Sequence, residues 1–226
     1  MKKPNHFNSR SAFRIPIHRM GMASSVVLLA SVFIFCGCLT RQPLNEQTFA
    51  FCAPEWPATN GTAGDGLLDI KSLQIAAPFD GRAFTYRTGE FSFVHDPYAG
   101  FLSFPAGELV ATISEMLQED GGFRIVPTGS GLRPDTLLEI SVRELYGDIR
   151  RPGSPEAVLG LQMVFIQATN GLPGRVILQR NYARRIPVKS SRASALMAGW
   201  NRALAEIIAE AASDFRRQEK WQMTRL

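Results

Sequence analysis

Alternation of hydrophobic and polar residues predicts that much of this chain forms β-strands. A period of two places successive side chains on opposite faces of a strand, as expected where one face is buried. Residues 157–168 (AVLGLQMVFIQA) are instead almost continuously apolar, which is typical of a central strand covered on both faces. The other predicted strands are residues 48–51, 69–76, 82–88, 91–93, 123–126, 135–149 and 175–188.

Two segments show the spacing of amphipathic helices instead. The first begins at Pro105, which suits the first turn of a helix, and ends at Gly121-Gly122. The second follows Ser190 and Ser191 and repeats apolar residues at helical spacing up to Phe215. We therefore predict an α+β fold, in which a mostly antiparallel sheet of about six or seven strands carries two main helices on one face.

Two features of the predicted sheet bear on function. Residues 82–88 and 91–93 are expected to form a hairpin with an aromatic face, and residues 95–104 are expected to be irregular.

The folded domain is assigned to residues 67–215. A tether and linker over residues 38–66 precede it, and a charged tail over residues 216–226 follows it.

The surplus of positive charge lies entirely in the first 19 residues. The chain has 25 Lys and Arg against 20 Asp and Glu, but residues 1–37 hold five basic residues and no acidic one. Residues 38–226 are therefore neutral, which argues against nucleic acid as a partner.

A basic start, an apolar run at residues 26–35 and a small residue before Cys38 describe a signal peptide over residues 1–37.

Residues 35–38 (FCGC) resemble a bacterial lipobox, in which a small residue precedes a cysteine that becomes lipidated. Gly37 fits the position before cleavage, which makes Cys38 the expected lipid attachment site, although Phe35 and Cys36 depart from the usual residues. An uncleaved membrane anchor and plain secretion stay open as alternatives. Leu39, rather than Asp, follows Cys38 and resembles the sorting pattern of lipoproteins at the periplasmic face of the Gram-negative outer membrane.

Few residues of the expected mature chain suit catalysis. His95 is its only histidine, and Cys52 is its only cysteine besides Cys38, so metal sites built on paired histidines or paired cysteines are excluded. A nucleophile elbow, a P-loop and a dinucleotide-binding fingerprint are all missing from the sequence. We therefore expect a protein that is not an enzyme and uses neither a cofactor nor a metal.

Residues 80–105 are the densest aromatic and polar stretch of the chain. Aromatic and arginine side chains dominate the energetics of protein interfaces, which makes this stretch the candidate partner-binding region. The alternative is an aromatic hairpin packed into the core, with Arg87 and Asp96 paired at its rim. The candidate partner-binding residues are Tyr86, Arg87, His95, Asp96, Tyr98 and Phe101.

This stretch also resembles the ABC-type transport auxiliary lipoproteins. The resemblance begins at Tyr86-Arg87, continues through residues 91–96 and 98–105 (YAGFLSFP), and covers roughly residues 67–215. Further matching residues are 133–135, 138–148 (LEISVRELYGD), 157–159, Ala195, Leu196, Gly199, Asn201, Ala203, Leu204 and Glu206.

The resemblance implies a non-catalytic lipoprotein that accompanies an ABC permease, an ATPase and an MCE-type protein spanning the periplasm. Such systems move phospholipids or other hydrophobic molecules between membranes. The expected partners are the MCE-type protein and, through the lipid on Cys38, the membrane; a homo-oligomer is left open. The alternative function is a free-standing envelope lipoprotein that binds a hydrophobic ligand or supports outer-membrane integrity.

Overall fold

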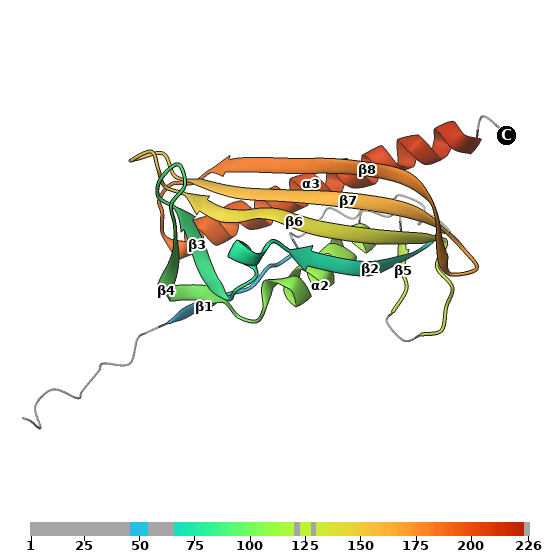
Figure 1. The fold of residues 1–226 in the computed structure, drawn as a ribbon, viewed down its shortest axis with the longest axis horizontal. Helices are drawn as coiled ribbons and strands as arrows, with labels where there is room; N and C mark the ends of the chain where they lie inside the picture. Colours follow the sequence, from blue (N-terminus) through green and yellow to red (C-terminus); the bar gives the residue numbers. More distant parts are fainter. Residues whose placement is uncertain (1–45, 54–65, 120–122, 128–129, 224–226) are drawn as a thin grey trace, which may run out of the picture. The chain divides into compact units, whose positions relative to one another are not determined.

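Three long strands near the C-terminal end of the sequence form the largest part of one sheet (Figure 1). They are β6 (Thr136–Asp148), β7 (Glu156–Thr169) and β8 (Leu172–Pro187), and they pair antiparallel in chain order. Asn170 and Gly171 connect β7 to β8 with φ angles of 53° and 78°. Two successive positive φ angles are typical of the tight hairpin turn for which Asn-Gly is the preferred sequence.

The other edge of β6 pairs with two shorter strands in succession. β2 (Leu67–Ile75) and β3 (Ala83–Arg87) both run parallel to β6, and the short 3-10 helix η3 (Ala77–Phe79) separates them. β4 (Phe93–Phe101) pairs antiparallel with β3, and β1 (Gln47–Phe49) pairs parallel with β4. The short strand β5 (Arg124–Ile125) pairs parallel with β2.

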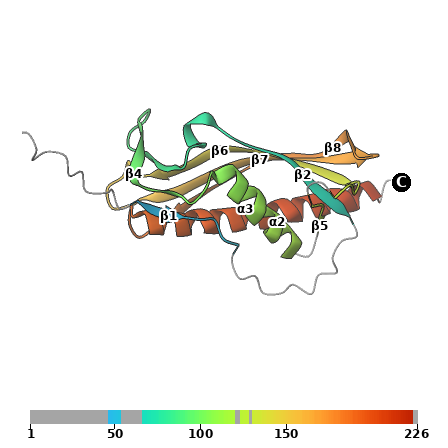
Figure 2. The same cartoon turned by 90° about the horizontal axis from the view of Figure 1, so that it is seen from below.

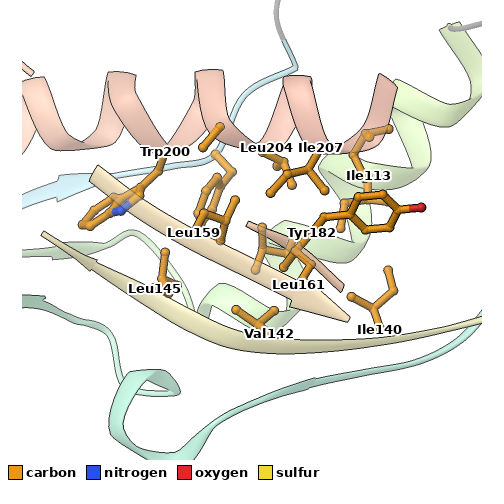
Figure 3. Close-up of a cluster of buried hydrophobic side chains, with 14 of the residues drawn as sticks. Ile113, Ile140, Val142, Leu145, Leu159, Leu161, Tyr182, Trp200, Leu204 and Ile207 are labelled. Carbon is orange, nitrogen blue, oxygen red and sulfur yellow. The ribbon is translucent and has the colours of Figure 1, made fainter. Parts of the chain in front are cut away.

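Both helices cover the same face of this sheet (Figure 2). α3 (Ala193–Met223) lies along β7 and β8, and α2 (Pro105–Glu119) packs on β2 and β5. Trp200, Leu204 and Ile207 of α3 are fully buried against Leu159 and Leu161 of β7 (Figure 3). The predicted α+β fold is confirmed, with eight strands in the described residues in place of the expected six or seven.

The computed structural model describes residues 46–53, 66–119, 123–127 and 130–223. They belong to one compact unit, residues 45–226. The expected signal peptide, Cys38 and the residues up to 45 lie outside the described residues. Within the described ranges, neither helix is both long and apolar enough to cross a bilayer.

The domain includes residues that the sequence pattern assigned to the tether and to the tail. Phe51 is buried in the core, and its backbone N–H donates a hydrogen bond to Glu108 Oε2 at 3.2 Å. The backbone N–H of Cys52 donates to Asn201 Oδ1 of α3, also at 3.2 Å. These contacts attach residues 46–53 to both helices. At the other end, α3 continues as far as Met223, through most of the expected tail.

Candidate functional site

A buried aromatic cluster holds β1, β3, β4 and α3 together beneath the candidate region. The ring of Phe84 on β3 lies 4.7 Å from that of Phe101 on β4 and 4.8 Å from that of Trp200 on α3, measured between centroids. The ring of Phe49 on β1 also contacts Phe84, with 5.5 Å between the ring centroids. Trp200 Nε1 also donates to the backbone carbonyl of Tyr146. Such aromatic pairs contribute stability beyond the area they bury.

A groove of about 590 Å³ brings together three of the predicted residues. Tyr86, Asp96 and Tyr98 line one side, on β3 and β4. The rest of the lining comes from β1, which pairs with β4, and from residues 191–194 at the start of α3 and just before it. The lining residues are Gln47, Tyr86, Asp96, Tyr98, Ala99, Ser191, Arg192, Ala193 and Ser194.

Asp96 is the centre of the hydrogen bonding in this groove. Its Oδ2 accepts a hydrogen bond from the phenol of Tyr86 at 2.8 Å, and its Oδ1 accepts one from the backbone N–H of Tyr98 at 2.8 Å. Burial of Tyr86, together with its hydrogen bond to the Asp96 carboxylate, raises the pKa of the Tyr86 phenol well above its usual value. Tyr86 is therefore a neutral donor that holds Asp96 in place.

Tyr98 is the most accessible of the predicted residues in the groove. Its side chain is 57% exposed, whereas Tyr86 is buried. A phenol ring with a polar edge and an exposed face suits contact with another protein. Tyr98 is therefore the most open of these three side chains, and Tyr86 holds the Asp96 carboxylate that binds the Tyr98 backbone.

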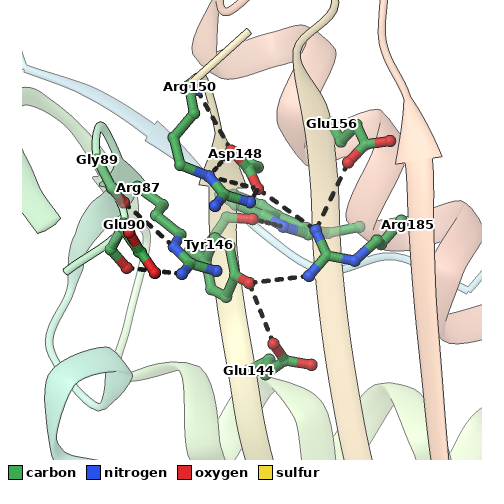
Figure 4. A network of polar contacts seen from close by, with 10 residues as sticks. Arg87, Gly89, Glu90, Glu144, Tyr146, Asp148, Arg150, Glu156 and Arg185 are labelled. Atoms are coloured by element: carbon green, nitrogen blue, oxygen red, sulfur yellow. Dashed lines mark hydrogen bonds and ion pairs between the residues drawn. The ribbon is translucent and has the colours of Figure 1, made fainter. Parts of the chain in front are cut away.

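Arg87 is held by the turn between β3 and β4, outside the groove lining. Its Nη2 donates to the Glu90 carbonyl at 2.7 Å and its Nε to the Gly89 carbonyl at 3.3 Å (Figure 4). The guanidinium also lies 5.7 Å from the centre of the Phe93 ring. The pairing of Arg87 with Asp96 that the core interpretation expected is therefore not observed, because the turn carbonyls occupy the guanidinium.

The structure separates the remaining two predicted residues. His95 is exposed on β4, and its Nδ1 lies 3.1 Å from Thr85 Oγ1. Phe101 is only 2% exposed and stacks within the aromatic cluster, so its side chain belongs to the core and not to a contact surface. Residues 95–101 form part of β4, which corrects the irregular segment expected there. Backbone pairing of residues 99–101 with β1 explains the regularity.

The side of the groove formed by α3 had no clear signal in the sequence. Ser191 and Arg192 precede a predicted helix, and serine before a helix is ordinarily interpreted as a cap. α3 begins at Ala193, and the carbonyl of Arg192 accepts its first hydrogen bonds, from the N–H groups of Ala195 and Leu196. Arg192, not Ser190 or Ser191, is therefore the residue directly before the helix. Only the packing of α3 on the sheet, where Trp200 contacts Phe101 of β4, brings Arg192 and Ser194 into one groove with Tyr98.

A charged network lies on the opposite face of the sheet, away from the helices (Figure 4). Buried Asp148 accepts hydrogen bonds from Arg150 Nη2 at 2.6 Å and from Arg185 Nη1 at 3.3 Å. The hydrogen bonds from Arg150 outweigh desolvation and lower the pKa of Asp148 to about 2. Arg185 also contacts Glu156, at 3.5 Å, and the Tyr146 hydroxyl. The mutual pairing of these charges is typical of a structural network.

The groove lining carries both hydrogen-bond donors and acceptors. It offers one carboxylate, one guanidinium, two serine hydroxyls, one amide and two phenols, of which the Tyr86 phenol already donates to Asp96. Within the part of the chain that the structure describes, no three His, Cys, Asp or Glu side chains are grouped to hold a metal ion. Cys52 is exposed, outside the groove lining.

No protein-family model matches this sequence, and no characterised protein matches it significantly. Solved structures do match in fold. A protein of the family DUF330 from Xanthomonas campestris superposes with a TM-score of 0.60 and 18% identity, over 79% of this chain and 97% of that one. An uncharacterised protein superposes with a TM-score of 0.59 and 13% identity, over 75% and 98% of the two chains.

A lipoprotein from Neisseria meningitidis matches more weakly, with a TM-score of 0.34 and 12% identity over 64% of this chain and 97% of that one. That similarity is too low to support an argument. Identities of 18% and 13% show a shared fold and nothing finer. In fold, this chain therefore resembles a DUF330 protein across nearly the whole of that protein's length.

Proposed function

We propose that this protein is a lipid-anchored, non-catalytic accessory subunit of an MCE-type ABC transport system, held at the periplasmic face of the outer membrane. The observation that carries the proposal is the position of the groove. It joins Tyr86, Asp96 and Tyr98, which belong to the family-like stretch, to Gln47 at the start of β1. Gln47 is nine residues from Cys38, the proposed anchor.

Proximity to the anchor suits a docking role. A protein that spans the periplasm meets the outer membrane at its far end, where a subunit tethered through Cys38 is held. The groove includes Gln47, the first residue of β1 after that tether, so in this proposal the partner reaches it without passing the long sheet. In this proposal the accessory subunit positions the MCE-type protein, and the transported hydrophobic molecules are carried by that partner.

Photocrosslinking in cells tests the docking groove. A crosslinking amino acid replaces Tyr98, and the matched control replaces Leu172, which is 68% exposed at the distant β7–β8 turn. We expect the probe at residue 98 to capture an MCE-type protein and the probe at residue 172 to capture none. Equal capture at both positions, or capture only at residue 172, would contradict the groove as the docking site.

The genes adjacent to this one discriminate between the two functions considered. Neighbouring permease, ATPase and MCE genes support the accessory role. If they are missing, and if crosslinking at residue 98 yields no MCE-type protein, the free-standing envelope lipoprotein becomes the better interpretation.

Metabolic labelling with palmitate tests the anchor separately. Cys38→Ala is expected to abolish incorporation of label, whereas Cys36→Ala and Cys52→Ser are expected to retain it. Label that persists in Cys38→Ala would rule out lipidation at that residue. Because the two control variants remove the other cysteines of the chain, the experiment identifies the modified residue directly.

A further inference from the structure

Large hydrophobic side chains are exposed around β4. Phe91, in the β3–β4 turn, is 88% exposed, and Leu102 and Phe104, between β4 and α2, are 62% and 66% exposed. Phe93 is only partly free, because its ring packs against Tyr146 at 5.5 Å. Burying apolar side chains this large lowers the free energy of the system. A group of them left exposed therefore indicates a surface that another molecule covers.

Leu102 and Phe104 follow β4 beside the last residue of β1, and Phe91 lies at the other end of β4, in its turn to β3. The backbone N–H of Leu102 donates to the carbonyl of Phe49, the last residue of β1, at 2.7 Å. Figure 1 shows β1, β3 and β4 at one end of the sheet, with the β7–β8 turn at the opposite end. The exposed apolar side chains around β4 and the start of β1 therefore share one end of the domain.

The sequence limits how far this end extends from the proposed anchor. Gln47 is nine positions after Cys38, and even a fully extended chain over that interval reaches only about 30 Å. A lipid on Cys38 therefore keeps the β1 end of the domain close to the bilayer. The opposite end, at the far side of long strands β6, β7 and β8, is not confined in this way.

Within the described residues, the exposed large aromatic side chains all lie on or beside β4, where exposed Val94 and Leu102 accompany them. Leu132, Leu172 and Val176, which are exposed elsewhere, are aliphatic, whereas the exposed aromatic residues of the described chain are Phe91, Phe93, Tyr98 and Phe104. Aromatic side chains favour the interfacial region of a bilayer, and they add a second attachment to a lipid anchor.

We infer that Phe91, Leu102 and Phe104 contact the surface of the bilayer that holds the anchor. The inference rests on the proposed lipidation of Cys38 and adds an orientation to it: the β3–β4 end rests on lipid, and the β7–β8 turn points away. Tyr98 lines the groove beside this surface and stays available to the partner. The apolar residues and the anchor together then restrain the domain against rotation.

Fluorescence of the lipidated full-length protein in vesicles tests this orientation. In a Cys52→Ser background, the variants Phe91→Cys, Leu102→Cys and Phe104→Cys are each labelled with a polarity-sensitive dye, and Leu172→Cys is the matched control. The vesicles contain phosphatidylethanolamine and phosphatidylglycerol, with or without nitroxide-labelled lipid. We expect a blue shift and quenching by nitroxide at the three test positions, and neither at residue 172.

Three results would overturn the inference. Equal quenching at residues 91 and 172 would mean that the domain has no preferred orientation. No quenching at residues 91, 102 and 104 in protein that floats with vesicles would mean that this end does not contact lipid. A blue shift that requires dense protein and is insensitive to nitroxide would assign the surface to a second copy of the chain. Failure to float, with no palmitate label, would instead refute the lipidation on which the inference rests.

Discussion

Gly199 of α3 lies so close to Ala157 of β7 that a side chain at residue 199 has no room. A Cβ atom added there would lie 2.6 Å from the Cβ of Ala157 and 2.8 Å from Cγ1 of Val188. The missing side chain lets α3 lie directly on the sheet, next to buried Trp200. Because α3 also forms one side of the groove, this contact sets the position of Arg192 and Ser194.

Gly199→Ala is expected to destabilise the domain. Replacing an exposed helical glycine with alanine normally favours folding by about 0.5–1 kcal/mol. At residue 199, overpacking against Ala157 outweighs that gain, and we expect the free energy of unfolding to fall by about 1–3 kcal/mol in urea denaturation. Gly107 on α2 is the control, since nothing lies within 4 Å of its added Cβ. A loss of stability in Gly107→Ala as large as in Gly199→Ala would argue against this explanation.

Tyr86→Phe tests the support of Asp96 in the groove. The substitution removes the phenol that donates to Asp96 Oδ2, and we expect the free energy of unfolding to fall by about 0.5–1.5 kcal/mol. Tyr98→Phe makes the same chemical change on an exposed ring and is expected to alter stability by less than about 0.5 kcal/mol. Thermal unfolding of the two variants under one condition provides the comparison; identical melting temperatures would contradict a supporting role for Tyr86.

Asp148 is expected to make the fold sensitive to acid. Hydrogen bonds from Arg150 lower its pKa from 3.8 to about 2 in the folded protein. A depressed pKa stabilises the fold above the unfolded value, and this contribution, about 2 kcal/mol, is lost as the pH falls from about 5 through 2. Asp148→Asn should therefore lower stability at pH 7 and flatten its decline between pH 5 and pH 2.

The exposed ion pair of Lys71 with Glu139 is the control for Asp148. Both side chains are partly solvated, and the pair is expected to contribute less than about 1 kcal/mol. Urea titrations at pH 7 of Glu139→Gln and Asp148→Asn measure the difference. Equal effects of the two substitutions at pH 7 would show that burial of Asp148 gives its network no special weight.

Asp214 tests the attachment of α3 to β8. It is buried, and burial by itself raises its pKa, but hydrogen bonds from Arg180, Arg217 and Tyr182 outweigh this and lower the pKa. Asp214→Ala leaves the buried Tyr182 hydroxyl without this acceptor, so we expect a loss of about 2–3 kcal/mol in chemical denaturation. Glu206→Ala, which removes a more exposed partner of Arg184 and Arg202, is expected to change stability by less than about 1 kcal/mol.

The sequence by itself determined the elements whose signals are local. Alternation predicted β6, and the continuous apolar run predicted the central strand β7. The sequence NGLPG at residues 170–174 predicted a turn after β7; Asn170 and Gly171 form it, and β8 already begins at Leu172. Helical spacing predicted α2 and α3, and the two helices imply a covered face. These features depend on periodicity and on turn chemistry within a few residues, so the local sequence is enough to predict them.

Only the tertiary structure decided which predicted residues share a site. Residues 95–101 became a strand because β1 and β3 supply backbone partners, and the same packing buried Phe101 and left Tyr98 exposed. Arg192 entered the groove because Gly199 lets α3 lie directly on the sheet. Contacts between residues about a hundred positions apart depend on how the elements pack, and no periodicity along the chain encodes that packing.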